Sequence, residues 1–180
     1  MKFKNLITTV CRASYANVWE AKTDKFGNTN YSIALLIPKS DTEGIKQLEQ
    51  AVEACKIDFF GPDRSKWPKA LEPTLRDGDD KDQPVYHDHV FLNAKSKDAP
   101  GIVNRQAKPI LDQDEFYSGC YCRASISFYG YDRGKAGVGV GLNNLMKWKD
   151  GDRLDGSVDA ETEFAQFADT TDDDVPDFLK

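Results

Sequence analysis

The chain has 180 residues, of which 39% are hydrophobic and 30% charged, and this composition favours one globular domain with appendages. No apolar run approaches the roughly 18 residues of a membrane span. The opening stretch MKFKNLITTV also lacks the apolar core of a secretory signal. We therefore expect a cytoplasmic protein without a membrane partner.

The formal net charge of −6 is divided unevenly along the chain. Residues 1–150 hold 22 Lys and Arg against 20 Asp and Glu, whereas residues 151–180 hold 2 against 10. We expect residues 1–150 to form the folded domain. Residues 151–180 have too few apolar side chains to offset the entropy of ordering, so we expect a largely disordered acidic tail with a brief turn over 161–167.

The amino-terminal part of the domain carries strand and hairpin signals. Residues 3–21 are rich in β-branched and aromatic side chains, which predicts one long strand or two short ones with a bend near 13–16. Turn residues at 24–28 then precede the apolar run YSIALLI at 31–37. This order predicts a hairpin whose second strand is buried.

One amphipathic helix is expected over 41–58. Ser40 and Asp41 are candidate caps, and Gly61 ends the pattern. The apolar residues repeat at spacings of three and four, at Ile45, Leu48, Val52, Cys55 and Phe59. Residues 61–83 follow as an irregular insertion with three prolines and alternating charge.

Further strands are expected at 84–96, 101–111, 117–131 and 136–148. Many short strands with one helix predict a mainly β fold, either a small antiparallel barrel or a sandwich. In the last strand Val138, Val140 and Leu142 share one face, and Gly137, Gly139 and Gly141 share the other. The glycine face predicts either a bare surface that a nucleic acid can approach closely or the curvature of a barrel.

Alternate residues of YSGCYCRASISFYGY (117–131) separate into two unlike faces. The expected core face holds Cys120, Cys122, Ala124, Ile126 and Phe128. The outward face holds Ser125 and Ser127 together with five candidate nucleic-acid-binding residues, Tyr117, Tyr121, Arg123, Tyr129 and Tyr131. Aromatic rings stack on bases and cations neutralise phosphates, so this face suits a single strand. The plainer alternative is that tyrosine is a common strand residue that pairs across a sheet.

Basic residues near these strands are candidates for the rim of such a surface. They are Lys95, Lys97, Arg105, Lys108, Arg133 and Lys135. The alternative is that they are ordinary, scattered surface cations. Tyr15, Trp19 and Trp148 are expected to pack in the core or against a partner.

Catalytic and metal-binding patterns are weak. The four cysteines suit a reducing compartment, and neither the C-x-C at 120–122 nor the HDH at 87–89 has the spacing of a zinc site. We therefore expect no metal and no cofactor. The rival interpretation is a metal-dependent nuclease that uses His87 and His89 with oxygens from DGDDKD (77–82).

The tail carries the sharpest motif. DDDVPDF (172–178) resembles the DDDIPF tip of bacterial single-stranded-DNA-binding proteins, although Asp177 is inserted and two residues follow Phe178. The resemblance implies that Asp172, Asp173, Asp174 and Phe178 recruit replication or recombination proteins and that the tail competes with DNA. The alternative is an acidic tail that only improves solubility.

A wider resemblance covers nearly the whole chain. The run 116–156, with YSIALLIPKSD and the acidic end, resembles phage-encoded single-stranded-DNA-binding proteins of OB-fold type, a family long filed as a domain of unknown function. The resemblance implies a five-stranded antiparallel barrel with extra elements and no cofactor. It further implies sequence-independent binding of single-stranded DNA in phage replication or recombination, in the host cytoplasm.

The expected protein is therefore not an enzyme. It binds a single strand on the outward face of 117–131, beside the glycines of 137–141. The alternatives are a metal-dependent nuclease, a protein-binding adaptor whose acidic tail mimics DNA, and a barrel that binds RNA, since stacking does not distinguish the two sugars. The sequence leaves the oligomeric state open, a homo-oligomer included.

Overall fold

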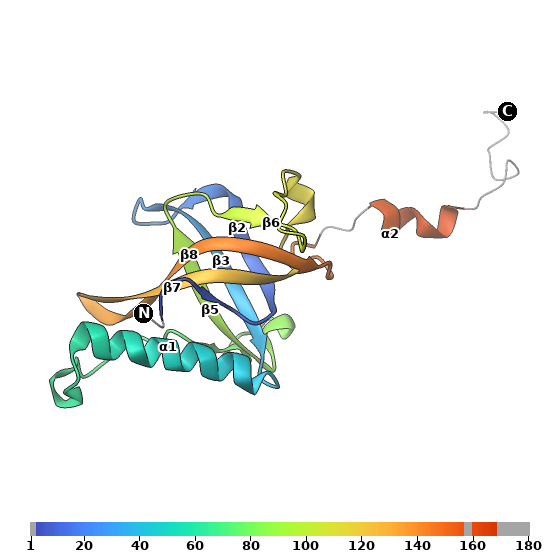
Figure 1. Cartoon of the computed structure of the whole chain (residues 1–180). Helices are drawn as coiled ribbons and strands as arrows, with labels where there is room; N and C mark the ends of the chain where they lie inside the picture. The colour runs from blue at the N-terminus through green and yellow to red at the C-terminus, as the bar shows by residue number, and fades with distance from the viewer. Residues whose placement is uncertain (1–2, 157–159, 169–180) are drawn as a thin grey trace, which may run out of the picture.

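A computed structural model of the chain describes residues 3–156 and 160–168. In these residues eight strands form one sheet. Five of the strands are long and close into a barrel (Figure 1). They are β2 (Cys11–Thr23), β3 (Thr29–Pro38), β5 (His89–Ser96), β7 (Tyr121–Arg133) and β8 (Lys135–Lys149).

The barrel closes through β7, which pairs with β8 on one side and with β2 on the other. β2 also pairs with β3, and β3 pairs with β5. All four of these pairings are antiparallel. The link between β5 and β8 is parallel, with Lys95 opposite Gly141. The strand order around the barrel is β2, β3, β5, β8 and β7. If the five long strands are numbered by their place in the chain, this is the order 1-2-3-5-4 of an OB fold. The predicted mainly β, OB-fold-like barrel is confirmed, with this one parallel link.

Short segments complete the wall where β5 and β8 diverge. β6 (Gly101–Val103) runs parallel to β8 near its end. Near the start of β8, the backbone N–H of Glu72 donates to the Ala136 carbonyl at 2.8 Å, and the Thr74 hydroxyl donates to the Val138 carbonyl at 2.8 Å. β4 (Arg76–Asp77) then pairs with β5, and β1 (Leu6–Ile7) pairs with β7. Residues 72–77 thus connect the start of β8 to β5.

The predicted helix is α1 (Thr42–Phe60), which lies below the strands in Figure 1. The Asp41 side chain accepts a hydrogen bond from the Gly44 amide, and Gly61, with a φ of 92°, ends the helix. The buried face includes Leu48, Ala51, Val52 and Cys55, which pack in the barrel core. Phe59 differs from the expectation, because its side chain is half exposed at the end of the helix.

The expected core face of residues 120–128 is confirmed. All five of its side chains are at most 1% exposed, and Val138, Val140 and Leu142 of β8 face the same core. The four cysteines are buried free thiols. Burial raises the pKa of the Cys11 thiol to about 12, so it remains protonated at neutral pH.

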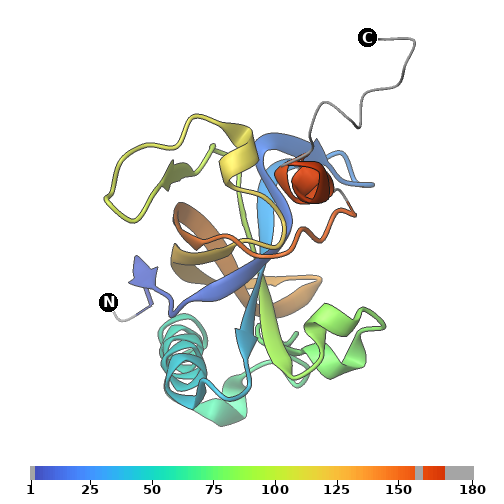
Figure 2. The ribbon, with the colours of Figure 1, turned by 90° about the vertical axis from the view of Figure 1, so that its right-hand side faces the viewer.

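The insertion before β5 covers half of the outer face of β3 and β5. Tyr86 packs there on Leu36 and Phe91, and its hydroxyl donates to Ser14 Oγ at 2.9 Å. β3 is therefore buried on both faces along this half, which explains its continuous apolar sequence. Figure 2 shows this green segment at the same end of the barrel as α1.

Three expected strands have different bounds in the structure. Residues 84–86 form a 3-10 turn, so β5 begins five residues later than predicted, at His89. Pro84 has no amide hydrogen for a strand ladder, and Asp88 has a φ of 60°, which interrupts extended backbone. The strand expected over 101–111 is confined to β6, and β7 begins at Tyr121 rather than at 117.

The acidic tail is described in part. α2 (Ala160–Phe164) and a 3-10 turn over 165–167 correspond to the brief turn expected at 161–167. The expected partner-binding residues, Asp172, Asp173, Asp174 and Phe178, lie outside the described residues. Among the described helices, none is long and apolar enough to cross a membrane.

Candidate nucleic-acid interface

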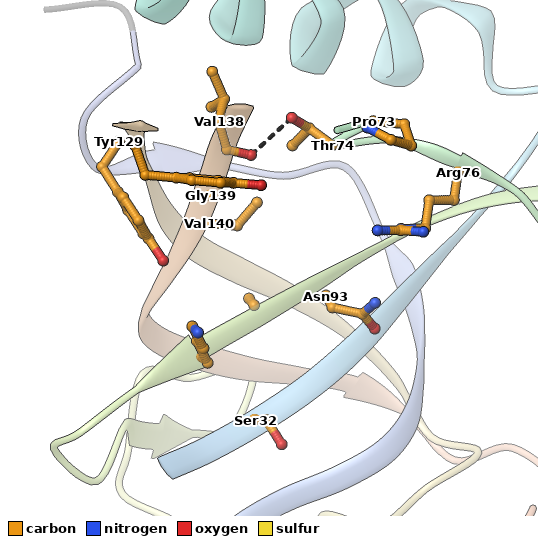
Figure 3. A pocket seen from close by; sticks show the side chains of 12 residues that line it. Ser32, Pro73, Thr74, Arg76, Asn93, Tyr129, Val138, Gly139 and Val140 are labelled. Atoms are coloured by element: carbon orange, nitrogen blue, oxygen red, sulfur yellow. Dashed lines mark hydrogen bonds between the residues drawn. The ribbon is translucent and has the colours of Figure 1, made fainter. Parts of the chain in front are cut away.

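A groove of about 530 Å³ lies on the part of the β3–β5 face that the insertion leaves open (Figure 3). β5 contributes Asn93 and Lys95 to it, and the β7–β8 hairpin contributes Tyr129, Tyr131 and Gly139. The segment before β5 closes the far side with Thr74 and Arg76. Three parts of the chain that are distant in sequence therefore meet in one groove.

A second hollow of about 320 Å³ adjoins the first at Lys95 and Tyr129, which line both. Asn28, Asn30 and Lys97 line it further along. The two hollows share these walls, and we treat them as one surface, the barrel groove. This groove extends from Arg76 to the hairpin that joins β2 and β3.

The tyrosines of the groove lie across glycines of the next strand. Tyr129 is paired with Gly139, and Tyr131 with Gly137. A Cβ atom on Gly139 would lie 2.4 Å from Cζ of Tyr129, and one on Gly137 would lie 2.9 Å from the Tyr131 hydroxyl. The glycines therefore make room for aromatic rings. At these two positions the glycine face is covered rather than bare, which differs from the first of its two expected roles.

Tyr129 presents a fixed aromatic surface to the groove. Its side chain is 40% exposed although its ring lies against β8. Partial burial raises the pKa of its phenol, so the ring remains neutral at physiological pH. A neutral ring held flat on a sheet is a suitable platform for a nucleobase.

Replacing single glycines of β8 with alanine should show which of them position a ring for base stacking. Gly139→Ala should displace the Tyr129 ring and weaken binding of a single-stranded oligonucleotide by roughly 5-fold or more, the worth of one stacked base. Gly141→Ala is the matched control, because its Cβ would meet only the Ser127 carbonyl, at 3.5 Å. Affinities of the two variants, measured beside their melting temperatures, test this prediction. Equal affinities would contradict it.

Three cations, Arg76, Lys95 and Lys97, line the barrel groove. Arg76, Lys95 and Lys97 form no salt bridge with any residue in the described parts of the chain. Lys95 also contributes, after the amide hydrogen bonds from Asn28 and Phe26, to the lowered pKa of Asp24. Unpaired cations beside aromatic rings match the chemistry of a strand with charged phosphates and flat bases.

Tyr121 and Arg123 lie at the other end of β7, near Trp148 and Arg105. The Arg105 guanidinium lies 4.1 Å from the centre of the Trp148 ring, and the Arg123 guanidinium lies 5.8 Å from it. We call these three residues the Trp148 cluster. Beside it, Lys149 Nζ lies 4.8 Å from the centre of the Tyr121 ring. Trp148 therefore contacts two guanidinium groups. The sequence predicts only that it packs in the core or against a partner.

Tyr117 is engaged within the protein. Its hydroxyl lies 3.0 Å from the Gly151 carbonyl and 3.1 Å from Asp150 Oδ1. The Arg153 guanidinium lies 4.2 Å from the centre of its ring. Tyr117 thus fastens the chain that follows β8 to the barrel, and much of its stacking surface is occupied.

Polar residues separate the two ends of the outward face. The Asn143 amide donates to Ser127 Oγ at 3.1 Å and to Ser125 Oγ at 3.4 Å, and it also contacts Asn5. Tyr129 and Tyr131 therefore belong to the barrel groove, whereas Tyr121 and Arg123 lie beside Trp148. The expected single platform is divided into two surfaces.

The other predicted cations lie near these surfaces. Lys108 is exposed in the turn after β6. Arg133 and Lys135 lie at the tip of the β7–β8 hairpin, where Lys135 Nζ is 3.8 Å from Glu72 Oε1. Sequence reasoning missed Arg76, because it lies in the irregular insertion and reaches the groove only through the short pairing of β4 with β5.

The residues of the rival nuclease site have structural partners. His87 Nε2 lies 2.9 Å from the Lys81 carbonyl. In the acidic loop, Lys39 forms salt bridges with Asp77 at 2.8 Å and with Asp79 at 2.6 Å, and these contacts lower the pKa of both carboxyl groups. In the described residues, no group of three or more His, Cys, Asp or Glu side chains could hold a metal ion.

A sequence profile described as the single-stranded-DNA-binding protein of Enterobacter phage Enc34 matches residues 4–176. The chain belongs to this family. The predicted family resemblance is thereby confirmed. A relative from Acyrthosiphon pisum secondary endosymbiont phage 1, called putative protein p50, is 33% identical over an alignment of 144 residues, and the alignment covers 76% of this chain and 78% of that protein.

Solved structures of phage proteins share the fold. The single-stranded DNA-binding protein from bacteriophage Enc34, in complex with single-stranded DNA, aligns with a TM-score of 0.71 at 21% identity, over 82% of this chain and 88% of that one. The gp2.5 single-stranded DNA-binding protein of bacteriophage T7 aligns with a TM-score of 0.57 at 17% identity, over 86% of this chain and 96% of that one. The barrel is thus a fold that these phage proteins have in common.

Proposed function

We propose that the protein binds single-stranded DNA without sequence preference and protects it during phage DNA replication or recombination in the host cytoplasm. One observation carries the proposal: the barrel groove combines tyrosine rings packed on glycines with three cations that form no salt bridge to any described residue. Membership of the Enc34 family supports it. Such binding needs neither a cofactor nor a metal, and we infer that the protein is not an enzyme.

Some groove residues contact the bases and others contact the phosphate backbone. Tyr129 and Tyr131 stack on bases, while Arg76, Lys95 and Lys97 neutralise phosphates. Contacts of this kind read no sequence, because every base has an aromatic face and every nucleotide a phosphate.

The Trp148 cluster extends the path of the strand beyond the groove. Arg105 and Arg123 contact phosphates there, with Tyr121 and Lys108 beside them, and Arg133 and Lys135 form the rim at the hairpin tip. We assign Tyr117 a positioning role, because its hydroxyl and ring already hold residues 150–153.

Fluorescence anisotropy of labelled oligo(dT), across a salt series, tests the binding function. We expect micromolar or tighter affinity that falls with salt by a slope of about −0.7 for each phosphate contact. Duplex DNA and RNA of equal length serve as competitors, and the RNA competitor tests the alternative of an RNA-binding barrel. Absence of binding at every salt concentration, with and without the tail, would favour the protein-binding adaptor instead.

The nuclease alternative has its own test. Labelled single-stranded and duplex DNA, incubated with the protein and magnesium or manganese, should remain intact. Cleavage that is lost on His87→Ala and His89→Ala substitution would overturn the non-enzymatic proposal.

The acidic tail is proposed to regulate the barrel groove. In this proposal residues 157–180 occupy the basic surface when DNA is absent, and DNA frees Asp172, Asp173, Asp174 and Phe178 to recruit replication or recombination proteins. The division of charge between the domain and the tail supports it.

Deletion of residues 157–180 should therefore tighten DNA binding. We expect a several-fold gain in affinity at low salt that disappears at high salt, because salt screens the attraction between tail and domain. Anisotropy titrations of the full chain and the truncated chain make the comparison. Unchanged affinity at low salt would contradict the competition.

A further inference from the structure

The turn between β2 and β3 displays an aromatic residue that packs against little of the protein. Phe26 is 77% exposed, although phenylalanine is ordinarily a core residue. Within the protein, Lys25 Nζ lies 5.1 Å from the centre of the Phe26 ring. The ring therefore has a free surface beside a cation, as in the barrel groove.

Hydrogen bonds fix this turn in one conformation. Asp24 Oδ1 accepts from the backbone N–H of Phe26 at 2.9 Å and of Asn28 at 3.0 Å. The backbone N–H of Asp24 donates to the Asn28 carbonyl at 2.9 Å, and Gly27 has a φ of 86°, which favours glycine. These amide bonds lower the pKa of Asp24, so its carboxylate is ionised and holds the turn at neutral pH. The backbone that carries the exposed ring is thus ordered before any ligand arrives.

The turn lies at the open end of the barrel groove. Asn28, two residues after Phe26, lines the groove together with Asn30, Lys97 and Tyr129. The loop between the first two strands of an OB barrel borders its ligand-binding face. A strand that leaves the groove past Tyr129 therefore meets the tip of this hairpin.

We propose that Phe26 is a base-stacking residue that binds the nucleotide next to those in the barrel groove, with Lys25 close to its phosphate. Because the backbone of the turn is already ordered, little backbone entropy is lost when a base stacks on the Phe26 ring. The inference rests on the proposed binding of single-stranded DNA and adds a contact at one end of the path.

Two oligonucleotides and three variants test the proposal. Phe26→Ala should weaken binding of oligo(dT) by roughly 5- to 100-fold and leave binding of an abasic oligonucleotide of equal length unchanged. Phe26→Trp should restore the affinity for oligo(dT). Ile57→Ala is the matched control, because Ile57 is an exposed apolar residue on α1 that does not line the groove. Melting temperatures of the variants should equal that of the unchanged protein.

The outcomes separate this inference from the binding function. If the unchanged protein binds oligo(dT) and Phe26→Ala binds it equally well, the role of Phe26 is overturned and the function stands. An equal loss on the abasic oligonucleotide would also overturn it, because stacking requires a base. If the unchanged protein binds no single strand, the function fails and the inference fails with it.

Discussion

Replacing Tyr129 with alanine should weaken binding of oligo(dT) by roughly 10- to 100-fold, because one base loses its aromatic platform at the centre of the barrel groove. Tyr129 lines both hollows of the groove, so its loss affects the part of the strand that lies in either of them. Tyr129→Phe should retain nearly all of the affinity, since stacking requires the ring and not the hydroxyl. Anisotropy titrations at one fixed salt concentration measure both variants.

The matched control is Tyr15→Ala. Tyr15 is 58% exposed on β2 and does not line the groove, so its removal should leave the affinity unchanged. Melting temperatures are needed as well, because the Tyr129 ring also covers Gly139. A folded Tyr129→Ala variant with the affinity of the unchanged protein would show that the groove tyrosine is only a sheet residue.

Reversing the charge at Lys95 and Lys97 together should have the largest effect on affinity. The double substitution to glutamate removes two phosphate contacts, so the slope of log affinity against log salt should fall in magnitude by about 1.4. Affinity near 50 mM salt should fall by roughly 50- to 100-fold or more. The loss should shrink as salt rises, because exposed charges are then screened.

The same charge change elsewhere provides the control. Lys46 and Lys66 are exposed and do not line the barrel groove, so glutamate at both positions changes the net charge equally. This control should lose little affinity and keep its salt slope. Equal losses in the two double variants would mean that DNA responds to the net charge of the domain rather than to the groove.

Much of the fold could be predicted because local pattern and tertiary structure agree. The alternation at 120–128 separates a buried face from a polar one, and all five inward side chains are buried. The spacing of Leu48, Val52 and Cys55 likewise identifies the buried face of α1. In both cases a period of the sequence matches the period of the element.

The errors in strand bounds arose where the chain departs from regular geometry. Residues 84–88 look like the start of a strand by composition, but Tyr86 packs on the outer face of the sheet instead of joining it. Its burial depends on Leu36 and Phe91, which are far away in the sequence, so no local pattern could show it.

The functional surface could be predicted only in part. Alternation placed Tyr129 and Tyr131 on the outward face, yet the pairing with Gly139 and Gly137 depends on the register of the β7–β8 hairpin. The division of that face depends on Asn143, whose side-chain amide donates hydrogen bonds to Ser125 and Ser127. Such contacts follow from strand register, which alternation within one strand does not determine.

Photo-crosslinking of oligo(dT) that carries 5-iodouracil tests most directly the claim that the barrel groove holds the strand. The cross-linked residues are identified by mass spectrometry of the digested complex. We predict cross-links at Tyr129, with Phe26 as a further site. Cross-links confined to Tyr121 and Trp148 would place the strand at the other end of β7 and contradict it.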